Sequence, residues 1–262
     1  RDFNSLISSG TGVFRKATAE EYNAVKDSLT DANIASTNGS PALVYLWDSN
    51  GEILYYSEAP VIYMNEDAGN MFKDVNLTTI DLSGLDSSKV TDMSYMFANL
   101  KGTTFVDLSK LDTSSATTLV GMFTGIGHSG LDLSTFDTRN VTAMNGVVGL
   151  MDNLEELNLS NWKFVKYAPS ENLIPGLTMN GTYNLKKLKL ENVKFPGALI
   201  RAISGISSLE EVSLKNSDTS EVADMNHMFY SDSSLKKIDF TGIDTSNVIN
   251  MSYMFYGCSS LV

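Results

Sequence analysis

The sequence has too few of several residue types to build some common kinds of protein. It contains a single cysteine, Cys258, which rules out an internal disulfide framework, and we expect that thiol to be packed in the interior. No apolar run approaches the roughly 20 residues that a membrane-spanning helix needs. Basic residues are scarce, with 19 Lys and Arg against 31 Asp and Glu. The net charge of −12 argues against nucleic acid or an anionic membrane as the main partner.

The sequence also lacks the residue patterns of common active sites. The two histidines, His128 and His227, lie far apart, and no serine or cysteine motif accompanies either. The glycines between 121 and 130 lack the lysine of a phosphate-binding loop. We therefore expect no catalytic residue, metal ligand or cofactor, and predict that the chain is not an enzyme. Because it starts at Arg1 and shows no secretion signal, we also expect a processed or excised portion of a longer protein.

What the sequence does contain is a repeat. Its strand-like segments end at apolar residues that follow one another at steps of 26, 25, 26, 31, 24 and 26 residues, namely Leu82, Leu108, Leu133, Leu159, Leu190, Leu214 and Phe240. A second anchor, the pair Met-Phe, recurs in the same register, as in Met96-Phe97 and Met122-Phe123. Two anchors in one register indicate a solenoid, in which stacked units bury a continuous core that a single unit could not.

Each unit has two halves with different apolar periods. Residues around Ile80 alternate between apolar and polar, which is typical of a strand with one buried face. The apolar residues that follow have the spacing of one helical face, namely Val90, Met93, Met96, Phe97 and Leu100. Between the halves lies Asp-Ser-Ser or Asp-Thr-Ser, as at Asp86 and Asp112, and these carboxylates are predicted to cap backbone amides at the corner.

The complete motif is clearest at 235–255, where an apolar-x-x-apolar-Asp strand precedes Asp244-Thr245-Ser246-Asn247-Val248 and Met251-Ser252-Tyr253-Met254-Phe255. This pattern resembles the BspA-like leucine-rich-repeat surface proteins of bacteria, and the resemblance covers about 65–262. It implies an α/β fold, a right-handed leucine-rich-repeat solenoid with a parallel β-sheet on one side. It also implies a secreted or wall-attached adhesion module rather than an enzyme.

The sequence ahead of the repeats differs from them and predicts a small α+β cap at 1–64. A capping box at Thr18 starts a helix at about 19–31, and Asp-Ser-Asn-Gly at 48–51 predicts a hairpin at about 42–57. The cap would cover the open edge of the first repeat. The solenoid is predicted at 65–262, with seven to eight repeats, an irregular part at 160–205, and an end in the middle of a repeat.

Two surfaces are candidates for function. The first is a ladder on the polar face of the strands, predicted from Asp81, Asp107, Asp132, Asn158 and Asp239. Neighbouring strands lie about 4.8 Å apart, so the first three carboxylates would be stacked in a row. Such a row is either solvated and hydrogen-bonded to flanking serines or bridged by a cation such as Ca²⁺.

The second candidate is a basic, aromatic-rich patch in the irregular part of the chain. Between 160 and 201 there are seven basic residues and two acidic ones, and Trp162, Phe164, Tyr167 and Tyr183 lie among them. The residues predicted to bind a ligand there are Lys163, Lys166, Tyr167, Lys187, Lys189, Lys194 and Arg201. A patch of this kind suits an anionic glycan or an acidic protein surface. The alternative is that the lysines only keep an irregular loop soluble.

These observations favour an extracellular or cell-surface bacterial module. We expect a monomer that binds a host or neighbouring-cell protein or glycan, an anionic one included, through a face of the solenoid, without membrane insertion. Two alternatives remain open. One is a passive stalk without a ligand of its own, and the other is a polysaccharide-cleaving enzyme that uses the acidic ladder with a metal.

Overall fold

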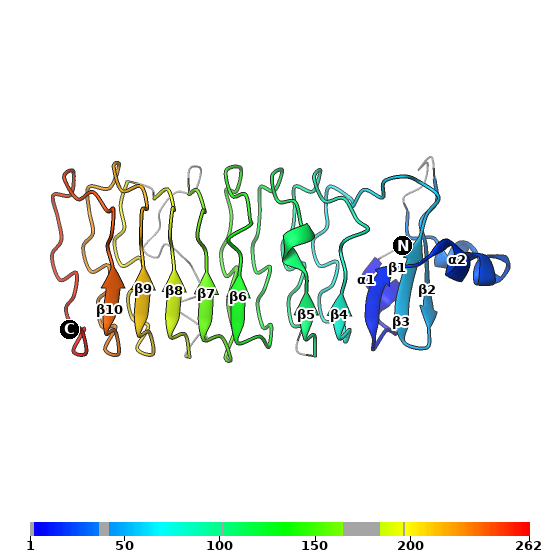
Figure 1. The fold of residues 1–262 in the computed structure, drawn as a ribbon, viewed down its shortest axis with the longest axis horizontal. Helices are drawn as coiled ribbons and strands as arrows, with labels where there is room; N and C mark the ends of the chain where they lie inside the picture. Colours follow the sequence, from blue (N-terminus) through cyan, green and yellow to red (C-terminus); the bar gives the residue numbers. More distant parts are fainter. Residues whose placement is uncertain (1–2, 37–41, 101, 165–183, 196) are drawn as a thin grey trace.

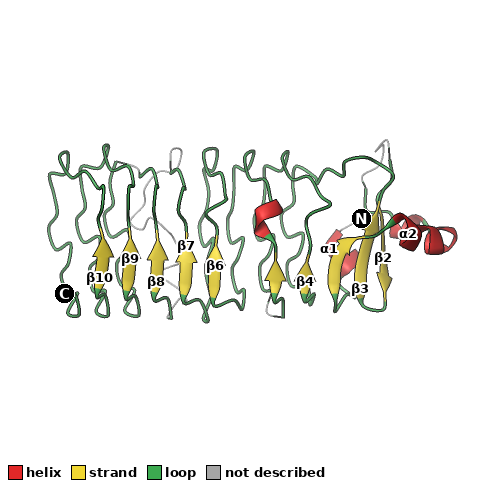
Figure 2. Ribbon diagram, viewed as in Figure 1, coloured by secondary structure: helices red, strands yellow, loops and turns green. Residues whose placement is uncertain are grey.

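The computed structural model describes residues 3–36, 42–100, 102–164, 184–195 and 197–262. It is a mixed α/β structure with few helices, and most of the chain outside the short strands is turn or loop (Figures 1 and 2). The helical elements are α1 (Phe3–Ile7), α2 (Ala19–Val25) and the 3₁₀ turns η1 (Lys26–Ser28), η2 (Asp31–Asn33) and η3 (Leu108–Lys110). The strands are β1 (Val13–Lys16), β2 (Tyr45–Ser49), β3 (Glu52–Tyr56), β4 (Thr79–Ile80), β5 (Phe105–Val106), β6 (Gly130–Asp132), β7 (Glu156–Asn158), β8 (Lys187–Lys189), β9 (Glu211–Ser213) and β10 (Lys237–Asp239).

The strands form two five-stranded sheets, ordered β2-β3-β1-β4-β5 and β10-β9-β8-β7-β6. The second sheet is parallel throughout, and its central apolar residues are aligned in register, as in Leu131, Leu157 and Leu188. Each of these strands comes from the next copy of the sequence repeat. Successive repeats therefore lie side by side along the long axis of the molecule (Figure 1).

Parallel bridges outside the sheets also connect successive repeats. One row follows the strand-to-corner turns and includes Lys163, Lys194 and Asp218. Another follows the opposite side of each repeat, as in Asp92 to Thr118 and on to Ala143. The sequence prediction of Asp caps holds at these turns, because corner carboxylates such as Asp86 and Asp112 accept a hydrogen bond from the amide two residues later.

The N-terminal unit joins the repeats through β1, a strand that the sequence pattern did not predict. β1 pairs in parallel with β3 on one side and with β4 on the other, so the first sheet runs from the hairpin into the repeats. The capping box is present, since Thr18 and Glu21 exchange side-chain and backbone hydrogen bonds. The predicted helix at 19–31 is too long, because α2 ends at Val25 and the backbone is extended at Leu29.

The predicted helical face at 90–100 is wrong, although its apolar residues are buried. Val90, Met93, Met96, Phe97 and Leu100 are all 0% exposed, yet the segment contains no helix. The reason lies in two residues between them, Tyr95 and Asn99, which have φ angles of 56° and 62°. A left-handed residue every fourth position folds the segment into successive turns, and helices do not tolerate such residues. The spacing that resembled a helix is the spacing of these turns.

The same left-handed position recurs in each described repeat and gives a matched pair of glycines. Gly121 (φ 61°) and Gly146 (φ 65°) both occupy it. A Cβ atom at Gly121 would lie 2.2 Å from a ring carbon of Tyr95, whereas one at Gly146 would have no atom within 4 Å.

We therefore expect Gly121→Ala to destabilise the protein more than Gly146→Ala. Gly146→Ala should cost about 1 kcal/mol, the strain of the left-handed backbone alone. Gly121→Ala adds a steric clash with Tyr95 and should cost roughly 1 kcal/mol more. Urea denaturation midpoints of the two variants measure the difference, and equal midpoints would contradict the assigned packing of Tyr95.

Candidate functional site

The sheet is interrupted between β5 and β6. These strands belong to consecutive repeats, yet β5 ends the first sheet and β6 begins the second. Figure 1 shows a wider gap between them than between the other strands of neighbouring repeats. The repeats remain connected elsewhere, because the Phe123 amide bonds the Val147 carbonyl and Thr118 bridges to Ala143. The structure therefore opens only on its strand side.

Three local features of the sequence coincide with this opening. After β5, Asp107 caps a 3₁₀ turn, since its carboxylate accepts from the amide of Ser109 at 3.1 Å and from its hydroxyl at 2.6 Å. In β6, Gly130 contributes no side chain to the sheet face. His128 stands where other repeats carry a fully buried leucine, as at Leu77, Leu154, Leu185, Leu209 and Leu235. The two repeats that flank the opening therefore both lack this leucine, because Thr103 occupies the same position ahead of β5.

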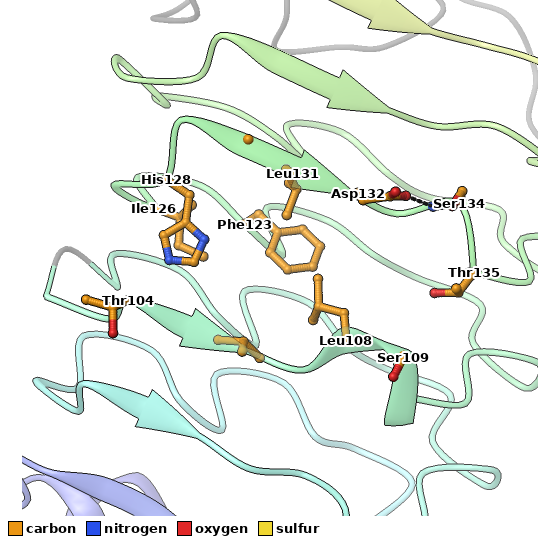
Figure 3. A pocket seen from close by; sticks show the side chains of 12 residues that line it. Thr104, Leu108, Ser109, Phe123, Ile126, His128, Leu131, Asp132, Ser134 and Thr135 are labelled. Atoms are coloured by element: carbon orange, nitrogen blue, oxygen red, sulfur yellow. Dashed lines mark hydrogen bonds between the residues drawn. The ribbon is translucent and has the colours of Figure 1, made fainter.

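A pocket of about 370 Å³ lies in the opening (Figure 3). Its apolar lining comes from Val106, Leu108, Phe123, Ile126 and Leu131. Its polar lining comes from Thr104, Ser109, His128, Asp132, Ser134 and Thr135, with Gly130 between them. An apolar floor with a few polar groups around it is the usual composition of a binding pocket.

The polar groups lie at opposite ends of the pocket. Figure 3 shows His128 and Thr104 at one end and Asp132 with Ser134 at the other. Nε2 of His128 lies 2.7 Å from the carbonyl oxygen of Thr103, and Oδ1 of Asp132 accepts from the amide of Ser134 at 2.9 Å. In the part of the chain that the structure describes, no hydrogen bond joins His128 to Ser109 or Asp132. The geometry suits binding and does not assemble a proton relay.

Asp132 remains charged at neutral pH. Partial desolvation of this largely exposed side chain tends to raise its pKa, but hydrogen bonds from Ser134 and Asn158 and the charge of Lys189 outweigh that effect and lower the pKa. The pKa of Asp107 is also lowered, chiefly by the hydroxyl of Ser109. The opening is therefore flanked by a carboxylate on each side, one after β5 and one at the end of β6.

The predicted acidic ladder is divided by the opening. Asp81 and Asp107 follow the paired strands β4 and β5, while Asp132, Asn158 and Asp239 belong to the second sheet. The prediction of three carboxylates stacked in one row is wrong, because β5 does not pair with β6. Each ladder residue accepts a hydrogen bond from the amide two residues later, which fixes the turn after each strand.

The predicted basic residues lie on different sides of the repeats. Lys187 and Lys189 are on β8, on the sheet face, and Lys163 bridges to Lys194 at the corner. Arg201 lies on a left-handed turn, 5.6 Å above the ring of Tyr230. Lys166 and Tyr167 lie outside the described residues.

Carboxylates from neighbouring repeats accompany several of these lysines. Lys187 lies 2.9 Å from Glu156, and Lys194 lies 3.2 Å from Glu221. Lys186 lies 3.1 Å from Glu155. Three of the seven basic residues between 160 and 201 therefore lie beside acidic residues that are distant in sequence and adjacent in space.

The predicted aromatic character of that patch is wrong at two positions. Trp162 is 0% exposed and Phe164 is 2% exposed, so both belong to the core. The indole of Trp162 donates to the carbonyl of Leu133 at 2.8 Å, which links two repeats through the interior. Tyr183, like Tyr167, lies outside the described residues. Phe164 stacks on Phe195 of the next repeat at 6.4 Å, at a position where other repeats carry Ser87 or Thr113.

Two other kinds of site are absent from the described residues. No three His, Cys, Asp or Glu side chains gather there in a way that could hold a metal ion. Among the helices of the described chain, none is long and apolar enough to cross a membrane.

The sequence was also compared with known proteins. A family model, DUF285, described as a Mycoplasma protein of unknown function, matches residues 66–180 and 197–262. No curated protein and no solved structure matches the chain. The two matched segments span most of the sequence and coincide with the repeats. The chain therefore belongs to the DUF285 family.

Proposed function

We propose that this chain is a right-handed leucine-rich-repeat solenoid of the BspA-like type that recognises a macromolecule at a bacterial cell surface or after secretion. The family match, the repeat register and the parallel pairing of successive repeats support this proposal. The N-terminal unit acts as a cap, since β1 occupies the edge of β4 that would otherwise be open. The ligand is a protein or glycan of a host or a neighbouring cell.

The opening between β5 and β6 is the observation that carries the proposal of binding. A passive stalk has no need for a pocket, whereas this repeat leaves an apolar floor accessible between polar ends. Leu131, which lines the pocket, is 7% exposed, against 1% for Leu157 and Leu188 at the same position of the continuous sheet. Pockets of this composition are the usual places where proteins hold ligands.

The test is a binding survey with the purified protein. The protein is applied to a glycan array and to a panel of host and bacterial surface proteins, and hits are quantified by surface plasmon resonance. We expect at least one saturable ligand. A protein that binds nothing in either survey would instead be a passive stalk, the alternative consistent with its elongated row of repeats (Figure 1).

A second survey separates the pocket from the basic residues. Changing Lys163, Lys187 and Lys194 together to Gln should leave the melting temperature nearly unchanged, because exposed ion pairs contribute little. Binding at the pocket should also be retained. If a ligand is lost in this variant and its affinity falls as salt is raised, the lysines and not the pocket hold it, since salt screens exposed charges.

A further inference from the structure

Within the second sheet, each repeat bonds its neighbour in the same way. The amide ahead of a strand donates to the preceding repeat, as Glu155 does to the carbonyl of Ser129 at 2.7 Å. The amide after a strand donates to the following repeat, as Leu133 does to the carbonyl of Asn158 at 2.8 Å. These bonds close the two ends of every strand pair in this sheet.

At the opening, the equivalent bonds are missing. In the described chain no backbone hydrogen bond joins 104–108 to 129–132. The carbonyl of Thr104 and the amide of Leu108 on one side therefore lack the partners that equivalent groups have. The amide of Ser129 and the carbonyl of Asp132 lack them on the other side. Among the described residues, two parallel strand edges thus face each other without the backbone hydrogen bonds that join the strand pairs of the second sheet.

The side chains around the opening specify what could pair with both edges. Every strand of the stack places one apolar residue over the core, such as Ile80, Leu157 or Leu188. An added strand would place its own central residue between Val106 and Leu131, which line the pocket. An apolar side chain is needed at this position.

The next residue of an added strand would lie on the polar face, between Asp107 and Asp132. Both carboxylates have lowered pKa values and are charged at neutral pH, for the causes given above. A carboxylate at this position would be repelled from both sides, whereas Lys or Arg would be attracted by both. Within the second sheet, the charge of Lys189 already lowers the pKa of Asp132 from two strands away, with Asn158 between them.

We propose that an extended segment of a partner protein, with an apolar residue followed by Lys or Arg, adds between β5 and β6 as a parallel strand. Addition of a strand to an exposed sheet edge is a common mode of peptide recognition, in which backbone bonds give affinity and side-chain pockets give specificity. Here the added strand would bond to the backbone donors and acceptors of both β5 and β6, and the two sheets would become one. This inference rests on the proposed recognition function and names the class of partner.

The probe is a synthetic peptide of residues 184–191, acetylated and amidated at its ends. It contains Leu188 followed by Lys189, and in the protein this segment already forms a parallel strand between two others. Isothermal titration calorimetry measures its binding to the purified chain, and hydrogen exchange follows the amides. We expect one peptide per chain, and slower exchange at Leu108 and Ser129 on opposite sides of the opening.

Matched variants locate the site. Asp107→Asn combined with Asp132→Asn keeps an oxygen for the amides of Ser109 and Ser134, so the turns should be retained. We expect this variant to bind the peptide at least tenfold more weakly, a loss of about 1.4 kcal/mol. Asp239→Asn, on the same face but far from the opening, should bind as the native chain does. A peptide with Glu in place of Lys189 should not bind the native chain.

The outcomes distinguish this inference from the proposed function. If the peptide does not bind, or binds without slowing exchange at Leu108 and Ser129, strand addition is overturned. Equal affinity of the double variant and the native chain overturns the role of the two carboxylates and the stated partner chemistry. If only glycans bind in the survey, the recognition function stands while the peptide partner is wrong. If nothing binds in either experiment, both proposals fail.

Discussion

Replacing Phe97 with Ala is expected to lower the stability of the protein by about 3–5 kcal/mol, the range for truncating a buried aromatic side chain. Phe97 is 0% exposed, and its ring lies between those of Phe72 and Phe123, with both centroid distances 5.7 Å. The three rings come from successive repeats. Loss of the central one therefore removes contacts with two neighbours and leaves a cavity that a row of aligned backbones cannot readily close.

The same position in another repeat supplies the control. Phe255 also stacks on its neighbour, Phe229, at 5.7 Å, but it is 41% exposed and its other side faces solvent. We expect Phe255→Ala to lower the free energy of unfolding by less than half as much, because folding removes less of the apolar area of this side chain from water. Chemical denaturation of both variants gives the comparison. Equal destabilisation would show that Phe97 does not lie inside a continuous column.

The identity of this column could be predicted from the sequence, but its backbone could not. A Met-Phe pair at a fixed distance after each strand is enough to indicate that Phe97 and Phe123 occupy equivalent buried positions. The same spacing also fits a helix, and periodicity alone does not separate the two. The left-handed residues Tyr95 and Asn99 decide the matter. Glycines at the equivalent position, Gly121 and Gly146, were the signal that could have revealed it, since glycine adopts this conformation at little cost.

The candidate site was harder to predict for a different reason. A repeat is recognised by residues that recur, whereas the opening lies where the recurring backbone hydrogen bonds between strands are absent. His128 in place of a buried leucine, together with Gly130 in the strand, marked this repeat as irregular. The residue pattern instead favoured 160–205, where irregularity is greatest, and there Trp162 and Phe164 belong to the core. At 128–130, by contrast, one polar residue and one glycine line the pocket in the opening.

The charge balance around the lysines also depends on contacts between repeats, which the order of residues along the chain does not reveal. Along the chain, the positive charges of the lysines between 186 and 194 seem to lack nearby carboxylates. In the fold, however, each lysine lies beside residues of the adjacent repeats. Glu156 and Glu221 provide the opposite charges, 2.9 Å from Lys187 and 3.2 Å from Lys194. In a repeat structure, charge must therefore be counted along columns of equivalent positions. Counted along the chain alone, Lys187 and Lys194 appear without the carboxylates that lie beside them.

A buried carboxylate near the end of the chain leads to the second large prediction, a loss of stability as pH rises. Asp232 is 0% exposed and occupies the column that contains Ile126, Ile206 and Cys258 in other repeats. Its Oδ1 accepts a hydrogen bond from the amide of Ile206 at 2.7 Å, while Oδ2 has no hydrogen-bond partner. Burial raises the pKa of this carboxyl to about 8, against hydrogen bonds from the backbone that lower it.

The sign of the effect follows from proton linkage. Below a pH of about 4, both the folded and the unfolded chain carry this proton, so the group has no effect on pH dependence. Between about 4 and 8, the unfolded chain releases the proton while the folded chain retains it, so stability falls as pH rises. Above about 8, both states are ionised and the loss levels off. The nearby titratable group is Cys258, whose pKa is raised by burial and by the charge of Asp232.

Asp232→Asn isolates this contribution, because the amide oxygen can still accept from Ile206 and the side chain carries no charge. We expect the variant to match the native protein in stability near pH 5 and to exceed it increasingly toward pH 8. With about 1.4 kcal/mol for each unit by which the pKa is shifted, the difference should grow by up to roughly 4 kcal/mol over this range. Asp132→Asn is the matched control, since the pKa of that carboxyl is lowered rather than raised. Thermal melts of the three proteins at pH 5 and pH 8 measure the effect. If the stabilities of the native and Asp232→Asn chains change in parallel with pH, Asp232 is ionised without cost and is not buried as described.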